Sequence, residues 1–433
     1  MSETVPKDKV ITREGIISEA EQNITRIRQV PTTLSHLKPL TAYRVEMHKH
    51  SFPFGTVLSG PLIRGKSHNP WVEKYLKEKN IDEVYVAKYL EFFQEHFSGA
   101  VIENDFKWQE MTNEDGSPLY LRTDTVMAFI REYPELMPNF RGHTIFWNRR
   151  KNLPIYLQNA SKKDIQEELF KKRLSVLQKY PDIPEWDIIN EPLKRHQGFW
   201  NCRNKHNEIV FDPVSDIDVF ADLILEAHKL APATRLYINE YSILSGRKTD
   251  DYIIFLEKLT SRLREKGLSN ENMKTFLGIG IQGHITTWDF ASIPQAKTNL
   301  DKVALLGLPI KITEFDVSDE QFGGKVQQRA EYMRDMLTLF YGHSAITGIY
   351  LWGFDERMHW RKAHGFNEHP ALTDSELRPN AVGEAFFRRI HHDWRTDLTT
   401  HSNEDGKIAF VGFPGSYKTT ELPTISREEN MIK

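Results

Sequence analysis

The sequence has a single cysteine, Cys202, among its 433 residues. No disulfide can therefore form within the chain, and a metal site built from several thiolates is excluded. No stretch approaches the roughly 20 consecutive apolar residues that a membrane-spanning helix needs, so we expect no membrane partner. The 57 Lys and Arg residues nearly balance the 60 Asp and Glu residues, and the formal net charge is −3. This balance gives no reason to expect nucleic acid as a partner.

The first ten residues, MSETVPKDKV, are polar and lack the apolar region of a secretory signal. We expect the protein either to stay in the cytoplasm or to be secreted after removal of a signal that this sequence does not include. Both possibilities stand, and no pattern in the sequence indicates an oligomeric state.

From residue 51 onward, short apolar runs alternate with longer helical stretches. Strands are predicted over 52–59, 99–105, 140–147, 185–191, 235–241, 276–284, 309–317 and 348–354. Helices are predicted between them, for example over 72–79, 161–180, 216–230, 251–267 and 326–342. Such alternation is typical of parallel β/α units. We therefore predict the α/β class and one closed (β/α)8 TIM barrel over residues 51–395.

The segments that flank this barrel have a different texture. Isoleucines within 7–30 are spaced as in an amphipathic helix, and residues 41–50 alternate like a strand. After the barrel, residues 396–433 contain a turn signal and alternating runs that indicate two strands. We predict an N-terminal extension over 1–50 and a C-terminal extension over 396–433, which together form a small β appendage that braces the barrel.

Polar and aromatic residues gather where seven of the eight predicted strands end. In a β/α barrel the loops at the carboxyl ends of the strands converge on the axis and carry the active site. We therefore predict one site at this face, built from Glu103, Asn104, Asp105, His143, Trp147, Asn190, Glu191, Asn239, Glu240, Gln282, His284, Glu314, Asp316 and Trp352.

Two carboxylates in this set, Glu191 and Glu314, end the fourth and the seventh predicted strands and can face each other across the cleft. Glycoside hydrolysis requires such a pair, because one group protonates the leaving oxygen while the other stabilises or attacks the oxocarbenium-like centre. A carboxyl separation of about 5–5.5 Å suits retention, and about 6.5–9.5 Å suits inversion. No cofactor is expected, and the histidines show no metal-ligand spacing, so we predict no metal site.

The sequence resembles glycoside hydrolase family 10, the barrel family best known for endo-β-1,4-xylanases. The resemblance covers roughly residues 51–395. It rests on eight motifs in family order, namely FPFG (52–55), ENDFKW (103–108), RGHTIFW (141–147), WDIINEP (186–192), INEYS (238–242), GIGIQGH (278–284), ITEFDV (312–317) and LWGFDERMHW (351–360).

The resemblance implies a role for each matching residue. Glu191 matches the acid/base and Glu314 the nucleophile, while Asn190 matches the residue that hydrogen-bonds the sugar 2-hydroxyl. His284 matches the histidine beside the nucleophile, and Asp316 would orient its ring. The remaining matches are to the lining of the sugar subsites (Glu103, Asn104, Lys107, His143 and Gln282), to its aromatic walls (Trp147, Trp352 and Trp360) and to supporting positions (Asn239 and Glu240).

Four segments depart from the family pattern, and one of them is the run 351–360, whose Asp stands one residue from its common position. The run 148–154, NRRKNLP, is longer than the usual path after the tryptophan, lacks a histidine and carries three cations. It is more typical of a solvated loop than of a site for acidic decorations such as glucuronate. Glu240 stands where Asp is usual, and the loop 193–206 differs from the expected short form.

The main hypothesis is an endo-1,4-β-xylanase that cleaves internal linkages of xylan or xylo-oligosaccharides by double displacement with net retention. A related β-glycosidase with changed specificity is the alternative, motivated by the run 148–154. A carbohydrate-binding barrel without activity is the third hypothesis, and the presence of both carboxylates argues against it.

Overall fold

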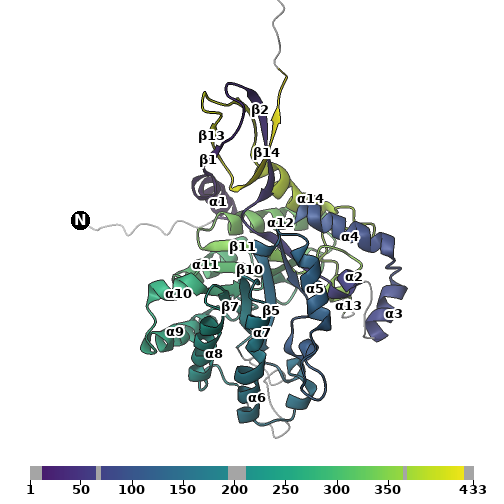
Figure 1. The fold of residues 1–433 in the computed structure, drawn as a ribbon, viewed down its shortest axis with the longest axis vertical. Helices are drawn as coiled ribbons and strands as arrows, with labels where there is room; N and C mark the ends of the chain where they lie inside the picture. The colour runs from purple at the N-terminus through teal and green to yellow at the C-terminus, as the bar shows by residue number, and fades with distance from the viewer. Residues whose placement is uncertain (1–11, 65–69, 194–210, 364–367, 424–433) are drawn as a thin grey trace, which may run out of the picture.

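The computed structural model describes residues 12–64, 70–193, 211–363 and 368–423, and its main body is a barrel of parallel strands (Figure 1). Each strand pairs with the next one in parallel, and the last strand pairs with the first, which closes the barrel. The eight strands are β3 (Phe54–Leu58), β4 (Gly99–Ile102), β5 (Phe140–Trp147), β6 (Glu185–Asn190), β7 (Arg235–Glu240), β8 (Leu277–Ile281), β10 (Ile310–Val317) and β11 (Ile346–Leu351). The predicted α/β barrel is thus confirmed.

The strands are buried on both faces, as expected where helices cover the outside of a parallel sheet. Every residue of β3, β4, β8 and β10 is buried, and these strands consist mostly of apolar residues. A two-residue strand, β9 (His284–Ile285), extends the β8 side and pairs with the end of β10. It aligns His284 with Asp316, so both residues lie at the same level of the barrel.

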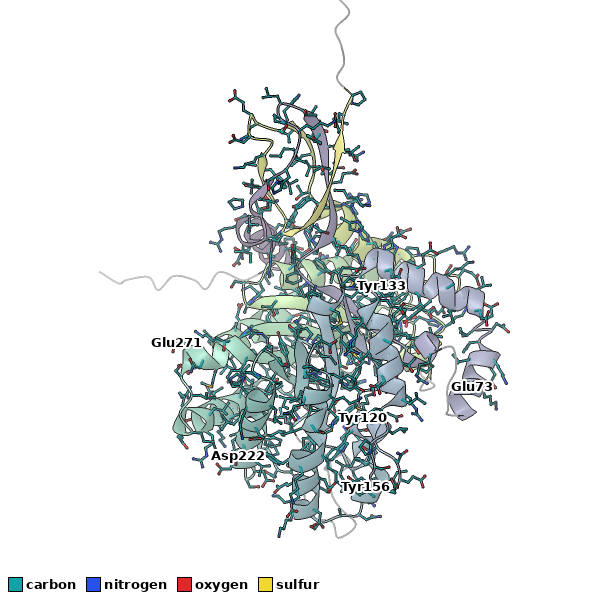
Figure 2. All side chains as sticks on the ribbon, in the orientation of Figure 1. Glu73, Tyr120, Tyr133, Tyr156, Asp222 and Glu271 are labelled. Carbon is teal, nitrogen blue, oxygen red and sulfur yellow. The ribbon has the colours of Figure 1, made fainter. Side chains whose placement is uncertain are left out.

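Helices between the strands form the outer layer of the barrel (Figure 1). They are α2 (Gly60–Arg64), α3 (Pro70–Glu78), α4 (Glu83–His96), α5 (Leu121–Arg131), α6 (Lys162–Glu168), α7 (Ser175–Lys179), α8 (Ile217–Leu230), α9 (Thr249–Glu265), α10 (Asn270–Phe276), α11 (Ile293–Ala304), α12 (Val326–Tyr341), α13 (Trp360–Ala363) and α14 (Ala381–Arg388). Figure 2 shows Asp222 of α8 and Glu271 of α10 at the periphery of this layer. Asp222 pairs with Lys266 at the end of α9, with 2.6 Å between the charged atoms.

The continuous helix predicted over 161–180 is interrupted. A widened π-turn over Leu169–Arg173 separates α6 from α7. The turn contains Arg173, a fully buried cation whose guanidinium donates to the carbonyls of Ile145 (2.9 Å) and Thr144 (2.7 Å) in β5. Because π-turns arise where a local contact outweighs regular helix geometry, this anchor to β5 explains why helical periodicity alone did not predict the break.

Two small antiparallel sheets form the appendage, as predicted. In the larger sheet, β2 (Ala42–His50) lies between β12 (Asp397–His401) and β14 (Gly415–Glu421). In the smaller one, β1 (Val30–Leu34) pairs with β13 (Ile408–Gly412). The C-terminal segment therefore supplies three strands rather than the predicted two. The strand β1 was missed, because its sequence VPTTL contains a proline and is mostly exposed.

The appendage joins the barrel at the amino-terminal ends of its strands. Phe413 of the appendage packs against Tyr341 at the end of α12, with ring centroids 6.2 Å apart, and Tyr341 packs against Phe54, the first residue of β3, at 5.2 Å. Helix α1 (Arg13–Arg28) binds at the same end, since Arg28 donates to the Ile346 carbonyl at the start of β11 (2.8 Å). The appendage thus lies away from the carboxyl ends, where the predicted site is. Among the described residues, no helix combines the length and apolar character needed to cross a membrane.

Candidate active site

The two predicted catalytic carboxylates lie at the carboxyl ends of two strands of the barrel, β6 and β10, which β7 and β8 separate. Glu314 belongs to β10, and Glu191 directly follows β6, where it adopts a left-handed backbone conformation with φ 51°. Gln282, directly after β8, connects them. Its carbonyl accepts from the Glu314 amide (2.8 Å), and its side-chain amide donates to the Glu191 carboxylate (3.2 Å). The structure therefore brings both carboxylates to one site.

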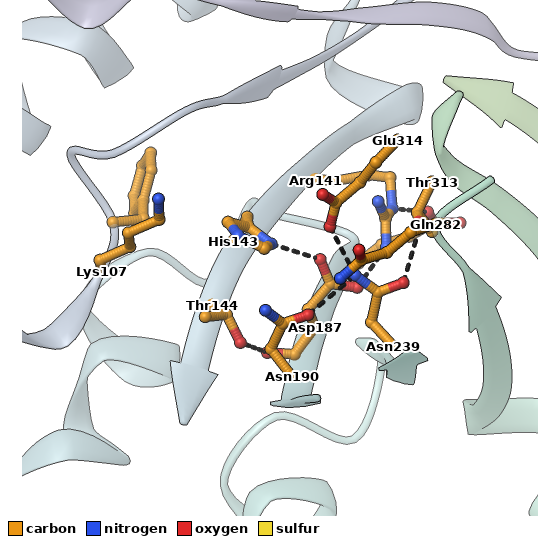
Figure 3. A network of polar contacts seen from close by, with 12 residues as sticks. Lys107, Arg141, His143, Thr144, Asp187, Asn190, Asn239, Gln282, Thr313 and Glu314 are labelled. Carbon is orange, nitrogen blue, oxygen red and sulfur yellow. Dashed lines mark hydrogen bonds and ion pairs between the residues drawn. The ribbon is translucent and has the colours of Figure 1, made fainter. Parts of the chain in front are cut away.

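Glu314 is buried and held by an amide network, which Figure 3 shows. The Asn239 side-chain nitrogen donates to Glu314 Oε1 (2.7 Å) and to Asn190 Oδ1 (2.9 Å). Thr313 donates to Asn239 Oδ1 (2.6 Å), which fixes the orientation of that amide. Within the described part of the chain, the buried Nδ2 of Asn190 has no hydrogen-bond partner. It can therefore donate to a bound hydroxyl, as the predicted contact of Asn190 with a sugar requires.

A histidine lies on the other side of Glu314. His284 Nε2 lies 3.1 Å from Glu314 Oε2, and its Nδ1 forms an ion pair of 3.0 Å with Asp316 Oδ2. Burial alone would lower the pKa of His284, but Asp316 and Glu314 outweigh it and raise the pKa to about 10. Burial would likewise raise the pKa of Asp316, but His284 lowers it to about 2. A cationic His284 thus bridges two carboxylates at neutral pH.

Asp316 has a second partner, the indole of Trp360, whose Nε1 donates to Oδ2 at 3.0 Å. The Trp360 ring also lies 5.2 Å from the ring of His284. The structure therefore joins the end of β10, the histidine of β9 and the start of α13 into one polar cluster around Glu314. This is where Asp316 and Trp360 were expected, and their predicted roles toward substrate stay predictions.

Glu191 has a different partner, which the sequence did not suggest. The guanidinium of Arg149 contacts Glu191 Oε2 and also lies over the Trp147 ring, with its carbon 5.1 Å from the ring centroid. The run 148–154 was expected to be solvated. That is wrong for Arg149, whose side chain is only 19% exposed. It is right for Arg150, which is exposed and donates to Asn159 (2.6 Å).

Glu240 lies behind the loop that carries Glu191. It is fully buried, and its oxygens accept from the Lys248 ammonium (2.7 Å) and from the backbone amide of Leu193 (3.0 Å). Burial raises the pKa of Glu240, and the Lys248 cation opposes that shift. The contact with Leu193 ties the segment after Glu191 to β7, and the supporting role predicted for Glu240 stays a prediction. The expected departure in the loop 193–206 lies almost wholly outside the described residues.

The predicted sugar-binding residues lie along one wall. Lys107 donates to Asn104 (2.7 Å), and its ammonium lies 5.1 Å from the Trp147 ring centroid. Burial lowers the pKa of Lys107, while Glu103 is first among the carboxylates that oppose this shift. His143 lies 5.0 Å from Trp352 and 6.0 Å from Trp147, measured between ring centroids. The structure thus brings these residues together between β4, β5 and the segment after β11.

Sequence reasoning missed the group that orients His143. Asp187, fully buried within β6, lies 2.8 Å from His143 Nδ1 and also pairs with Arg141 (Figure 3). Burial would raise the pKa of Asp187, but Arg141 and His143 together lower it. The available signal was an aspartate inside the apolar strand WDIIN, where an unpaired charge would be costly. Among the described residues, no group of three or more His, Cys, Asp or Glu side chains is arranged to hold a metal ion.

Comparison with known proteins gives one family. The family described as Glycosyl hydrolase family 10 matches residues 71–388. The chain is 29% identical over 387 residues to Endo-1,4-beta-xylanase 1 of Arabidopsis thaliana, covering 88% of this chain and 35% of that protein. It is 25% identical over 421 residues to Anti-sigma-I factor RsgI6 of Acetivibrio thermocellus, covering 95% of this chain and 47% of that protein. The chain thus spans about a third to a half of these relatives.

The fold is similar to that of solved structures. Xylanase 10B of Thermotoga petrophila, solved in complex with xylobiose, superposes with a TM-score of 0.60 at 20% identity. The alignment covers 79% of this chain and 94% of that one. The family match extends over well more than half of the chain and includes every barrel strand from β4 to β11. This chain belongs to glycoside hydrolase family 10.

Proposed function

We propose that the protein is a retaining endo-1,4-β-xylanase. The observation that carries this proposal is the placement of Glu314 and Glu191 at one site, with Gln282 bonded to both residues. A pair of carboxylates at the carboxyl face of a barrel is what glycoside hydrolysis requires. Both acids sit in the sequence contexts that the family resemblance assigns to nucleophile and acid/base.

In the first step, a Glu314 oxygen attacks the anomeric carbon while Glu191 protonates the departing glycosidic oxygen. The bond from the anomeric carbon to that oxygen breaks, and a glycosyl ester with Glu314 forms. Contacts from Asn239 and His284, one to each carboxylate oxygen, orient Glu314 for this attack. Since the contacts come from residues of β7 and β9, the nucleophile is positioned before substrate arrives.

In the second step, Glu191 acts as a base and takes a proton from water, which attacks the anomeric carbon and releases Glu314. Two inversions at that carbon give net retention. Since no described residue bonds the Nδ2 of Asn190, this atom can donate to the 2-hydroxyl, a contact expected to strengthen in the oxocarbenium-like transition state.

Two comparisons support xylan as the substrate, and one wall of the site suits a sugar ligand. The relative from Arabidopsis thaliana is named an endo-1,4-beta-xylanase, and the Thermotoga petrophila structure holds xylobiose. In this chain, Trp147, Trp352 and the ammonium of Lys107 line one wall of the site, which suits stacking and hydroxyl binding by sugars.

A non-catalytic carbohydrate-binding barrel is the second candidate. It is favoured by the relative named an anti-sigma factor, which shares 25% identity over nearly the whole chain. A relative of this chain is therefore named for a role other than hydrolysis. In this chain, however, both carboxylates and their hydrogen-bonding neighbours are in place, and these groups favour hydrolysis over binding alone.

The test is incubation of purified protein with xylohexaose and with cellohexaose, followed by chromatography and proton NMR of the products. Xylo-oligosaccharides of intermediate length, released first as β-anomers, are expected. Early α-anomers would contradict retention. Cleavage of cellohexaose alone would favour the alternative of changed specificity. Binding of xylohexaose by calorimetry without any product would favour the binding barrel.

A further inference from the structure

Helix α13 begins with Trp360, which lies beside the proposed nucleophile. Its indole nitrogen donates to Asp316 (3.0 Å), and its ring lies 5.2 Å from that of His284, which contacts Glu314. The family resemblance assigns this indole to the aromatic walls of the sugar site. A single hydrogen bond fixes one atom of the ring and not its plane. The orientation of the plane therefore depends on what packs against it.

The next residue, Arg361, packs against this ring and is buried. Its guanidinium carbon lies 4.8 Å from the Trp360 ring centroid, and its side chain is only 4% exposed. Its Nε lies 2.5 Å from Oε2 of Glu368, whose side chain is 7% exposed. A buried cation requires a paired anion, and a planar guanidinium that is paired in this way has little rotational freedom. Glu368 thus restricts the plane that lies over Trp360.

Glu368 is attached to the end of β10, the strand that carries the proposed nucleophile. The hydroxyl of Ser318, directly after β10, donates to the Glu368 carboxylate. The following backbone amide, that of His369, donates to Asp319 Oδ1 (2.8 Å). The ion pair with Arg361 therefore connects α13 to the segment after β10 by a route that is separate from the indole hydrogen bond.

We propose that Arg361 and Glu368 are positioning residues that hold the Trp360 indole in the orientation in which it binds a sugar unit of xylan. The inference rests on the proposed function. It deepens that function, because it assigns a part in substrate binding to a buried ion pair outside the predicted site residues. A ring that contacts substrate and transition state alike contributes uniform binding, so loss of its orientation raises KM and leaves kcat unchanged.

The double variant Arg361→Met/Glu368→Leu removes the pair without leaving an unpaired buried charge, so it should fold. The matched control is Lys362→Met/Glu356→Leu, which removes a second ion pair of α13, with side chains 20% and 29% exposed. With xylohexaose, KM should rise about five- to tenfold in the first variant, the scale of one lost aromatic contact, while kcat stays within about twofold. Both constants should stay within about twofold in the control. An unchanged KM in the first variant, an equal rise in both, or a fall in kcat at constant KM would overturn the proposal.

A second background tests whether the pair acts through Trp360. In Trp360→Ala the sugar contact is absent, so KM should already be raised about five- to tenfold. Removing the Arg361–Glu368 pair in that background should change KM by less than about twofold, because mutations that remove the same contact are not additive. An unchanged KM in Trp360→Ala, or a second rise of the same size on removal of the pair, would show that the pair does not act through this ring.

A measurement without substrate keeps this inference distinct from the proposed function. In protein labelled with 15N at tryptophan, the Trp360 indole signal can be identified by its loss in Trp360→Phe. The order parameter of its Nε1–H bond should be high in wild type and in the control, and lower in Arg361→Met/Glu368→Leu, because the ring then samples several orientations. Equal order parameters would refute the positioning role even in an active enzyme. A lowered value in a protein that hydrolyses no glycoside would support positioning while contradicting the proposed function.

Discussion

The two proposed catalytic carboxylates are held by different kinds of structure. Glu314 lies inside the fully buried strand β10, and its partners Asn239 and His284 come from strands β7 and β9. Glu191 lies just beyond β6 in a left-handed backbone conformation, and its ionic partner Arg149 comes from a loop. The partners of Glu314 thus come from strands of the barrel, whereas one partner of Glu191 comes from the loop after β5.

This difference follows the chemistry proposed for each group. A nucleophile must be aimed at one carbon, and rigid strands provide that orientation. An acid/base has to exchange partners and protons in each turnover, which a loop contact permits. The contrast makes distinct predictions for the two sides of the cleft and for the appendage, which lies at the opposite end of the barrel.

The largest effect is expected from Glu314→Gln. Loss of the attacking carboxylate should lower kcat on xylohexaose by at least about 10⁴-fold, because the covalent step is then unavailable. Asn239 can still contact the glutamine, so the fold should be retained and circular dichroism should match wild type. Turnover within tenfold of wild type would exclude Glu314 as the nucleophile.

Glu191→Ala should have a smaller effect that depends on the leaving group. With xylohexaose, kcat/KM should fall by about 10³-fold, since general acid catalysis contributes on the order of 10²–10⁴. With 2,4-dinitrophenyl β-xylobioside it should stay within a few-fold of wild type, because that leaving group departs unprotonated. Equal losses on both substrates would show that Glu191 is not the acid, and would remove the contrast between the two sides of the cleft.

The pH dependence of stability should report on the Glu314 side. The pKa of His284 is raised to about 10, so in the folded state this ring keeps a proton that the unfolded chain loses above its ordinary value of 6.5. Its contribution to stability is therefore complete below pH 6.5 and is lost as the pH rises toward 10. The difference in Tm between wild type and His284→Gln should shrink from pH 6 to pH 10 in thermal melts. A constant difference would contradict a cationic His284.

Phe413→Ala should leave the site unchanged while weakening the appendage. Phe413 is buried where the appendage meets the barrel, with its ring centroid 6.2 Å from that of Tyr341. Removing a buried phenyl ring costs about 3 kcal/mol of unfolding free energy, so Tm should fall. Because this contact lies at the amino-terminal ends of the strands, kcat/KM on xylohexaose should change by less than twofold at 25 °C. A tenfold loss would show that the appendage contributes to the site.

Most of the barrel and the positions of the site residues could be predicted from the sequence. The segments WDIINE and ITEFDV are apolar runs of strand length that end in polar residues. Closure of the barrel brings these polar ends together at one face. The same logic placed Gln282 and His284. These residues lie on regular strands, so their relative positions follow from the register.

Features that depend on contacts between distant segments could not be predicted. The break at the π-turn reflects Arg173 reaching carbonyls of β5, and β1 exists because β13 lies beside it. Nothing in the sequence NRRK distinguishes Arg149 from the other two cations. The structure does, because the turn places the Arg149 guanidinium over the Trp147 ring and against Glu191. Sequence periodicity in a loop does not show whether Arg149 or Arg150 points toward Glu191.

The most direct test of the central claim is to trap the covalent intermediate. Protein treated with the dinitrophenyl glycoside of 2-deoxy-2-fluoroxylobiose should gain the mass of one fluoroxylobiosyl group, because the fluorine slows the second step more than an activated first step. Digestion and tandem mass spectrometry should then locate the added mass on Glu314, and Glu314→Gln should remain unlabelled. Label on Glu191, or hydrolysis of xylohexaose with inversion and no label at all, would contradict the account.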